Sequence, residues 1–375
     1  MQKNQEFIDD INRSVWVMNK PDGKKIDLNI EDFGSEEQSS RIIINEDDLL
    51  ADDIPPKAYP GLQSQPIIQQ DQKPLAIRSS SLVQLAFAGL AGGVLAWGIT
   101  EFLFENDAWI YQSYTQILIE ASYFGAVIGS VIGAALGSVE GLSGRVGSKA
   151  ISGMLISLFV GLVGGALGGL TGQLVYGWLG GGQLDNISTQ ILVRGFSWSL
   201  IGLFIGFGQG LGTGGGRKIV NGLLGGFIGG AVGGLLFDFI AMIFYGGVVS
   251  RAIAISLLGL STGLLIGVVQ EIRKQAWVQA VEGPTAGKEY IINTGKTRIG
   301  SSPKNDIVLI KDDQVAEQHA TIELENNSYF ITKYNYASDM FINNHKVNKH
   351  QLKNGDLIGI GEYLLRYCDK KVGER

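Results

Sequence analysis

Cysteine and histidine are scarce in this 375-residue chain, which has one Cys, Cys368, and three His. A lone cysteine excludes an internal disulfide, and three histidines leave little material for a zinc site. We therefore predict no metal and no cofactor, and we expect the soluble parts to be cytosolic. Charged residues make up only 18% of the chain and sum to −6, which excludes a basic surface for nucleic acid.

Enzyme motifs are also missing. The segment "GTGGGRK" (residues 212–218) is rich in glycine, but it lacks the Gly-Lys-Ser/Thr ending of a phosphate-binding loop. No predicted strand precedes it, so it is interpreted as a turn between two helices. We predict no catalytic residues and no enzymatic activity.

Glycine is abundant, and most of the 54 Gly lie between residues 89 and 267, where nearly all long uncharged runs also lie. Glycine is unfavourable inside water-soluble helices but allows helices in lipid to approach closely. Six runs approach the length of about 20 residues that spans a bilayer. The sequence therefore predicts a transmembrane domain over 79–270, with spans at about 81–104, 118–139, 150–176, 195–212, 219–245 and 252–270.

Basic residues alternate between the connectors of these predicted spans. Arg78 precedes the first span, Lys149 follows the second, Lys218 the fourth and Lys274 the sixth, whereas the first connector has none. This alternation predicts a multi-pass protein of the bacterial cytoplasmic membrane, in contact with lipid and with both termini cytoplasmic. Arg194 and Arg251 depart from the pattern, and we expect them to reach into the headgroup region.

An internal repeat supports the count of six. A shift of 69 residues pairs Gly133 with Gly202 and Lys149 with Lys218, which predicts three copies of a two-helix hairpin. Glycines recur every four residues in the second and fifth spans, a pattern typical of close helix packing. Asp238, deep in the fifth span, is the intramembrane polar candidate. A structural hydrogen bond and a transport role both stay open for it.

The first 78 residues have fifteen acidic and nine basic side chains, and Pro and Gln accumulate at their end. Such a composition predicts a mostly disordered cytoplasmic tail. The tail contains no Thr, so a phosphothreonine clamp between tail and C-terminus is excluded.

From Trp277 the pattern changes to short alternating runs, among them "AWVQAV", "ATIELE" and "YLLRY", separated by Gly, Asn and Asp. Period-two alternation with such turns predicts an all-β sandwich over 277–370.

Three motifs in this region resemble the forkhead-associated (FHA) domain, a β-sandwich that reads phosphothreonine: "TRIGSSPKNDIVL" (297–309), "VAEQHATIE" (315–323) and "MFINN" (340–344). The resemblance implies that the retained positions are structural and that the histidine braces the binding loops. These positions are Gly300, Asn305, Asp306, His319 and Asn343.

The phosphopeptide-loop positions depart from the family pattern. Ser301 stands where the family has Arg, Ala316 and Glu317 replace a Ser-Arg pair, and Ser338 replaces an Asn. An Arg fork and a hydroxyl are strong phosphate ligands, so their loss predicts loss of phosphothreonine binding. Lys304 is the side chain on the same loop that would offer a partial substitute.

The sequence thus predicts a multi-domain membrane protein with a six-helix glycine-rich bundle and a degenerate FHA-like sandwich. We expect a membrane-anchored scaffold that recruits a cytoplasmic protein partner without phosphothreonine. Two alternatives stay open: a phosphothreonine-dependent reader of phosphoproteins in kinase signalling, and a channel or transporter gated by the sandwich. A homo-oligomer also stays open.

Overall fold

The structure is a computed structural model that describes residues 81–103, 113–179, 187–244, 247–292, 295–334 and 336–370. The predicted tail, residues 1–78, lies outside the described residues. The side chain of Asp238 lies outside them as well, although the helix backbone there is described.

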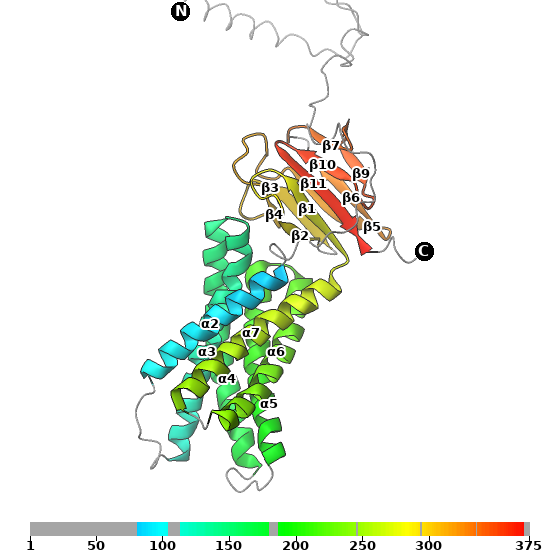
Figure 1. The fold of residues 1–375 in the computed structure, drawn as a ribbon. Helices are drawn as coiled ribbons and strands as arrows, with labels where there is room; N and C mark the ends of the chain where they lie inside the picture. The colour runs from blue at the N-terminus through cyan, green and yellow to red at the C-terminus, as the bar shows by residue number, and fades with distance from the viewer. Residues whose placement is uncertain are drawn as a thin grey trace, which may run out of the picture. The chain divides into compact units, whose positions relative to one another are not determined.

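In the described part of the chain, six long apolar helices precede the strands, as the sequence predicts (Figure 1). Most of them extend several residues beyond the predicted spans. That they cross a membrane stays a prediction based on their length and composition. Their bounds are α2 Ser81–Leu103, α3 Tyr114–Ser143, α4 Gly147–Trp178, α5 Ile187–Thr213, α6 Gly216–Ile243 and α7 Gly247–Arg273.

Glycine allows these helices to touch backbone to backbone. A Cβ on Gly161 of α4 would collide with the carbonyl oxygen of Gly129 in α3, and one on Gly226 of α6 with that of Gly202 in α5. The first and last helices, which lie side by side in Figure 1, meet in the same way, because a Cβ on Gly89 would strike the carbonyl of Gly259. Close backbone approach of this kind is typical of helices packed in lipid.

Large apolar side chains lie on the outside of the bundle. Phe102 is 82% exposed, and Phe87, Phe159 and Val249 are also well exposed. Contiguous apolar surface is uncommon on soluble monomers, so this surface requires a nonaqueous environment or a partner.

The C-terminal strands form two facing sheets, as predicted. One sheet has the strand order β2-β1-β11-β10-β7-β8 and the other β4-β3-β5-β6-β9. The strand bounds are β1 Ala276–Glu282, β2 Glu289–Ile291, β3 Lys296–Gly300, β4 Ile307–Val308, β5 Ala320–Glu325, β6 Ser328–Lys333, β7 Met340–Ile342, β8 His345–Lys346, β9 Lys349–Gln351, β10 Leu357–Ile360 and β11 Tyr363–Asp369.

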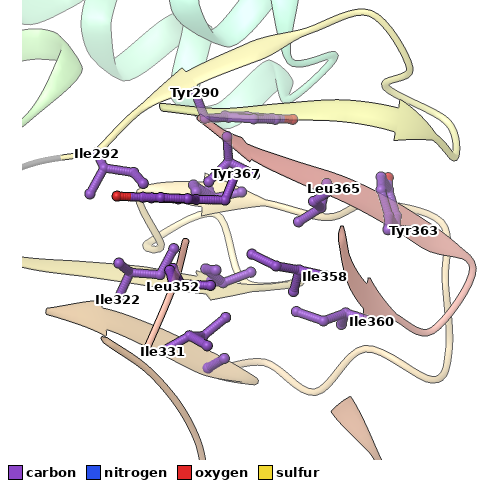
Figure 2. Close-up of a cluster of buried hydrophobic side chains, with 14 of the residues drawn as sticks. Tyr290, Ile292, Ile322, Ile331, Leu352, Ile358, Ile360, Tyr363, Leu365 and Tyr367 are labelled. Carbon is purple, nitrogen blue, oxygen red and sulfur yellow. The ribbon is translucent and has the colours of Figure 1, made fainter. Parts of the chain in front are cut away.

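Alternate residues of these strands fill the space between the sheets (Figure 2). Ile322 and Ile331 come from one sheet, and Ile358, Leu365 and Tyr367 from the other. The alternation that predicted strands therefore also selects the core, because successive side chains point to opposite faces of a sheet.

Two asparagine pairs close two of the tight hairpins of the sandwich. Asn326 and Asn327, between β5 and β6, have φ of 47° and 65°, and Asn343 and Asn344, between β7 and β8, have 49° and 71°. Positive φ at both central residues is the requirement of a two-residue hairpin turn that matches strand twist, and Asn tolerates it.

Candidate functional site

Three loops meet at one end of the sandwich because of the strand register. Ile299 at the end of β3 pairs with Ala320 at the start of β5, and Ala320 also pairs with Lys333 at the end of β6. The loops after β3, before β5 and after β6 therefore emerge together. We call this surface the loop face; it comprises residues 301–306, 310–319 and the described residues of 334–339.

The first two loops are tied together through Asn305. This side chain is 2% exposed, and its Nδ2 donates to the carbonyl oxygen of Glu317 at 2.5 Å. A Cβ at Gly300 would collide with the same carbonyl oxygen, so the close approach of the loops requires glycine there. The structure thus brings these two predicted structural positions together.

His319 and Asp306 also hold the loops. His319 is fully buried, and its Nδ1 accepts a hydrogen bond from the Ala316 amide at 3.3 Å. Burial, the largest cause, lowers the pKa of His319 below its usual value, so the ring is held neutral. Asp306 Oδ2 accepts from the backbone amide of Arg298 at 2.9 Å.

Asn343 lies away from these loops, in the β7–β8 turn. Its Nδ2 donates to Asp356 Oδ1 at 2.9 Å, and its Oδ1 accepts from the Leu357 amide at 3.0 Å. These bonds join the turn to the start of β10, so Asn343 serves to hold the β7–β8 turn in place.

The positions that bind phosphate in FHA domains have different side chains in this protein. Ser301 is half-buried with its amide bonded to the Ala316 carbonyl at 3.0 Å, and Ser338 donates its hydroxyl to the Gln314 carbonyl. Glu317 and Lys304 are both exposed. Among the phosphopeptide-loop positions predicted from the sequence, Glu317 and Lys304 are therefore the charged ones, and the Ser338 hydroxyl already bonds to a neighbouring loop.

Two features of the loop face were not predicted from the sequence. Tyr334 and Tyr336 stack with ring centroids 5.6 Å apart, and Tyr336 is well exposed. In addition, Lys149 of α4 donates to the carbonyl oxygens of Asn305 and Asp306 at 3.2 and 3.3 Å. No pattern in the sequence indicated the second contact, which joins residues more than 150 positions apart.

Within the described ranges, no group of three or more His, Cys, Asp or Glu side chains comes together in a geometry that would hold a metal ion. The two roles left open for Asp238 stay predictions, because its side chain lies outside the described residues.

Comparison with known proteins supports the FHA resemblance. Residues 279–371 match a family described as the inner membrane component of the T3SS, cytoplasmic domain (Yop-YscD). The glycogen accumulation regulator GarA of Mycobacterium tuberculosis is 32% identical over 93 residues, 24% of this chain and 57% of that protein. The oxoglutarate dehydrogenase inhibitor of Corynebacterium jeikeium is 30% identical over 87 residues, 23% of this chain and 60% of its own length.

The resemblance of the C-terminal region to the FHA domain is thereby confirmed. This chain matches less than two-thirds of the length of either relative. Among solved structures, an FHA domain from Chlamydia trachomatis is 23% identical with a TM-score of 0.24, covering 25% of this chain and 97% of that one. The cytoplasmic domain of the T3SS sorting platform protein PscD from P. aeruginosa is 19% identical with a TM-score of 0.24, covering 26% and 82%.

Proposed function

We propose that this chain is a membrane-anchored scaffold whose sandwich binds a cytoplasmic protein partner through the loop face without requiring phosphothreonine. One observation carries the proposal. The framework that shapes the loops is intact, with Asn305 and Gly300 at the Glu317 carbonyl, whereas the phosphate positions hold Ser301 and Ala316. A surface kept in shape without its phosphate ligands favours recognition of an unphosphorylated segment.

Charge and hydrogen bonding at the face agree with this proposal. A phosphate dianion is held by charged hydrogen bonds, each contributing about 1.5–3 kcal/mol. Ser301 offers a neutral donor in place of a guanidinium, the Ser338 hydroxyl is directed to Gln314, and exposed Glu317 repels an anion. The stacked pair of Tyr334 and Tyr336 adds apolar area of the kind enriched at protein interfaces.

Membrane anchoring rests on the bundle. Its exposed Phe and Val side chains fit a lipid environment, and the matching family is described as an inner membrane component with a cytoplasmic domain. The chain enters the sandwich directly after α7, at the end of the bundle where Lys149 and Lys218 begin α4 and α6. Basic residues mark the cytoplasmic side of membrane proteins, so the sandwich is assigned to the cytoplasm.

The alternative function that the loop face leaves open is binding of phosphothreonine. Lys304 is exposed on the loop that also carries Ser301, so it is placed to contribute a charge. A single lysine supplies a point charge, without the paired geometry of an Arg fork.

The test is affinity capture from the cell of origin, using the full chain in lipid nanodiscs, before and after phosphatase treatment of the extract. A partner retained after phosphatase and lost with Glu317→Arg supports the proposal. Glu325→Arg is the matched control, because Glu325 lies at the other end of β5, away from the loops. Binding that appears only with phosphothreonine and disappears with Lys304→Ala would instead establish the reader.

A further inference from the structure

Four charged side chains from distant parts of the chain meet where the bundle adjoins the sandwich. Glu140 lies near the end of α3, Lys149 and Lys218 lie in the first turns of α4 and α6, and Lys288 directly precedes β2. Lys218 Nζ donates to Glu140 Oε2 at 2.7 Å, and Lys149 Nζ to Oε1 at 3.5 Å. Lys288 Nζ donates to the main-chain oxygen of Glu140 at 3.2 Å. We call these four residues the Glu140 cluster.

The cluster is largely removed from solvent. The side chain of Glu140 is 21% exposed, and those of Lys149 and Lys218 are 17% and 15% exposed. Exposed ion pairs contribute little to stability, whereas removing one partner of a shielded pair leaves an uncompensated charge. Here one carboxylate faces three ammonium groups, so its loss would leave them repelling one another.

Apolar packing does not explain how the sandwich is held in place at this point. The bundle and the sandwich have separate hydrophobic cores. A cavity of about 80 Å³, lined by Glu140, Lys218 and Lys288 among others, lies beside the cluster. Further polar ties, such as Lys274 Nζ to Glu289 at 2.5 Å, lie close to the covalent connection between the two parts. The Glu140 cluster ties the sandwich to helices other than α7 at a distance from that connection, whereas Arg217 of α6 donates to Gln275 Oε1 at 2.8 Å directly beside it.

Lys149 carries the connection onward to the loop face. Its ammonium group bonds to Glu140 and also to the carbonyl oxygens of Asn305 and Asp306. The Asn305 side chain in turn bonds to the Glu317 carbonyl in the next loop. A continuous series of hydrogen bonds therefore runs from the end of α3 to two of the three loops of the face.

The electrostatics of Lys288 agree with this picture. Burial, the largest cause, lowers the pKa of Lys288 to about 8; Lys149 and Lys218 lower it further, and Glu140 opposes them. Burial therefore disfavours the charged form of this lysine of the sandwich, and the Glu140 carboxylate is the group that favours it.

We propose that Glu140 is a positioning residue for the loop face: with Lys149, Lys218 and Lys288 it latches the β3–β4 loop to the ends of α3, α4 and α6. A change in the relative position of these helix ends then alters the shape of the loops, and occupation of the loops alters the helix ends in return, since coupling between two sites is reciprocal. This latch does not depend on the identity of the partner, or on whether a partner binds.

The test is hydrogen exchange of the full chain in lipid nanodiscs, comparing the unaltered protein with Glu140→Gln. The substitution keeps the size of the side chain but removes its charge and replaces one acceptor oxygen with an amide donor. Loss of charge-assisted bonds to two lysines predicts amide exchange at least about tenfold faster in residues 301–306 and around Lys288. Exchange in the glycine-packed middle of α3 and α4 should be unchanged.

Glu101→Gln is the matched control, because Glu101 pairs with Arg251 through bonds of 2.6 and 3.0 Å outside the cluster. It should leave residues 301–306 unaffected. Lys149→Met is a second variant that removes the contact to Asn305 and Asp306 and should accelerate exchange in the β3–β4 loop while leaving the surroundings of Lys288 protected. Unchanged exchange of residues 301–306 in both variants, or uniformly faster exchange along α3 and α4, would overturn the latch. Partner capture is a separate readout, so failure of the proposed function would leave this result intact.

Discussion

In the bundle, glycine lines the helix contacts and large apolar side chains point outward, whereas in the sandwich Ile and Tyr fill the interior and charged residues lie outside. The two regions therefore differ in where most large side chains lie, although the bundle also buries a core of Ile and Leu side chains. In the sandwich, burial of apolar area is the main stabilising contribution. In the bundle, with apolar groups exposed, close backbone contact takes that role. Substitutions that add or remove bulk should distinguish the two regions.

The largest effect is expected when bulk is removed from the sandwich. Ile331 in β6 is fully buried, and Ile331→Ala should reduce the free energy of unfolding of the sandwich by about 2–5 kcal/mol, because it leaves a cavity. Hydrogen exchange of the β5 and β6 amides measures this loss. Thr332→Ala, at the exposed neighbour on the same strand, should cost far less. Equal effects of the two changes would show that the sandwich core is not the stabilising element.

The next effect comes from adding bulk to the bundle. Gly161→Leu places a side chain against the carbonyl of Gly129 and should separate α3 from α4, at a cost of about 1–3 kcal/mol. Thermal unfolding in nanodiscs measures it. Gly98→Leu is the control, since a Cβ there would meet no atom of another element within 4 Å. If Gly98→Leu destabilises the bundle as strongly, helix propensity rather than packing determines its stability.

A smaller, pH-dependent effect on stability is expected from His319, because protonation of this single side chain is coupled to unfolding. Its pKa is lower in the folded sandwich than the ordinary value of 6.5, so the unfolded chain binds the proton first. Stability from this group is therefore complete above about pH 6.5 and declines as the pH falls below it. His319→Gln should flatten the dependence of β5 amide exchange on pH, corrected for intrinsic exchange, and His345→Gln should not. If the pH dependence of β5 amide exchange persists in His319→Gln, other titratable groups cause it.

The smallest effect should come from an exposed ion pair of the sandwich. Lys349 Nζ lies 2.9 Å from Glu325, with both side chains at least 40% exposed. Lys349→Ala should cost about 0.2–1 kcal/mol and the difference should shrink in high salt. Chemical unfolding at two salt concentrations checks this. If Lys349→Ala instead lowers the free energy of unfolding by several kcal/mol at both salt concentrations, exposed ion pairs stabilise this protein as strongly as the shielded Glu140 cluster.

The sequence predicted the sandwich in considerable detail because alternation and turn residues are local signals. The alternating segments after residue 276 account for the described strands of the sandwich except β8 and β9, which alternation does not predict. Both are two or three residues long and lie at sheet edges, and β8 is fully exposed, so they have no apolar alternation to detect. Individual loop residues were recognised from motif spacing, but the use of the Ser338 hydroxyl between loops was not, since it depends on where Gln314 lies in space.

For charged residues in the apolar segments too, the sequence did not predict which residues they contact. The internal repeat aligns Lys149 with Lys218 and indicates orientation, whereas Glu140 merely follows the predicted second span, 118–139. Arg251 was expected to reach toward headgroups, whereas the structure pairs it with Glu101. Each residue was visible in the sequence, but its partner was not.

By itself the sequence determined the division into an acidic tail, six apolar glycine-rich segments and an FHA-like sandwich without the phosphate ligands of that family. These follow from composition, periodicity and motif, which are properties of neighbouring residues. Only the tertiary structure decided that Glu140 meets Lys149, Lys218 and Lys288, and that Lys149 reaches the loop of Asn305. Such contacts depend on how the helices pack and where the sandwich lies against them, and no local pattern records the distance between residues 150 positions apart.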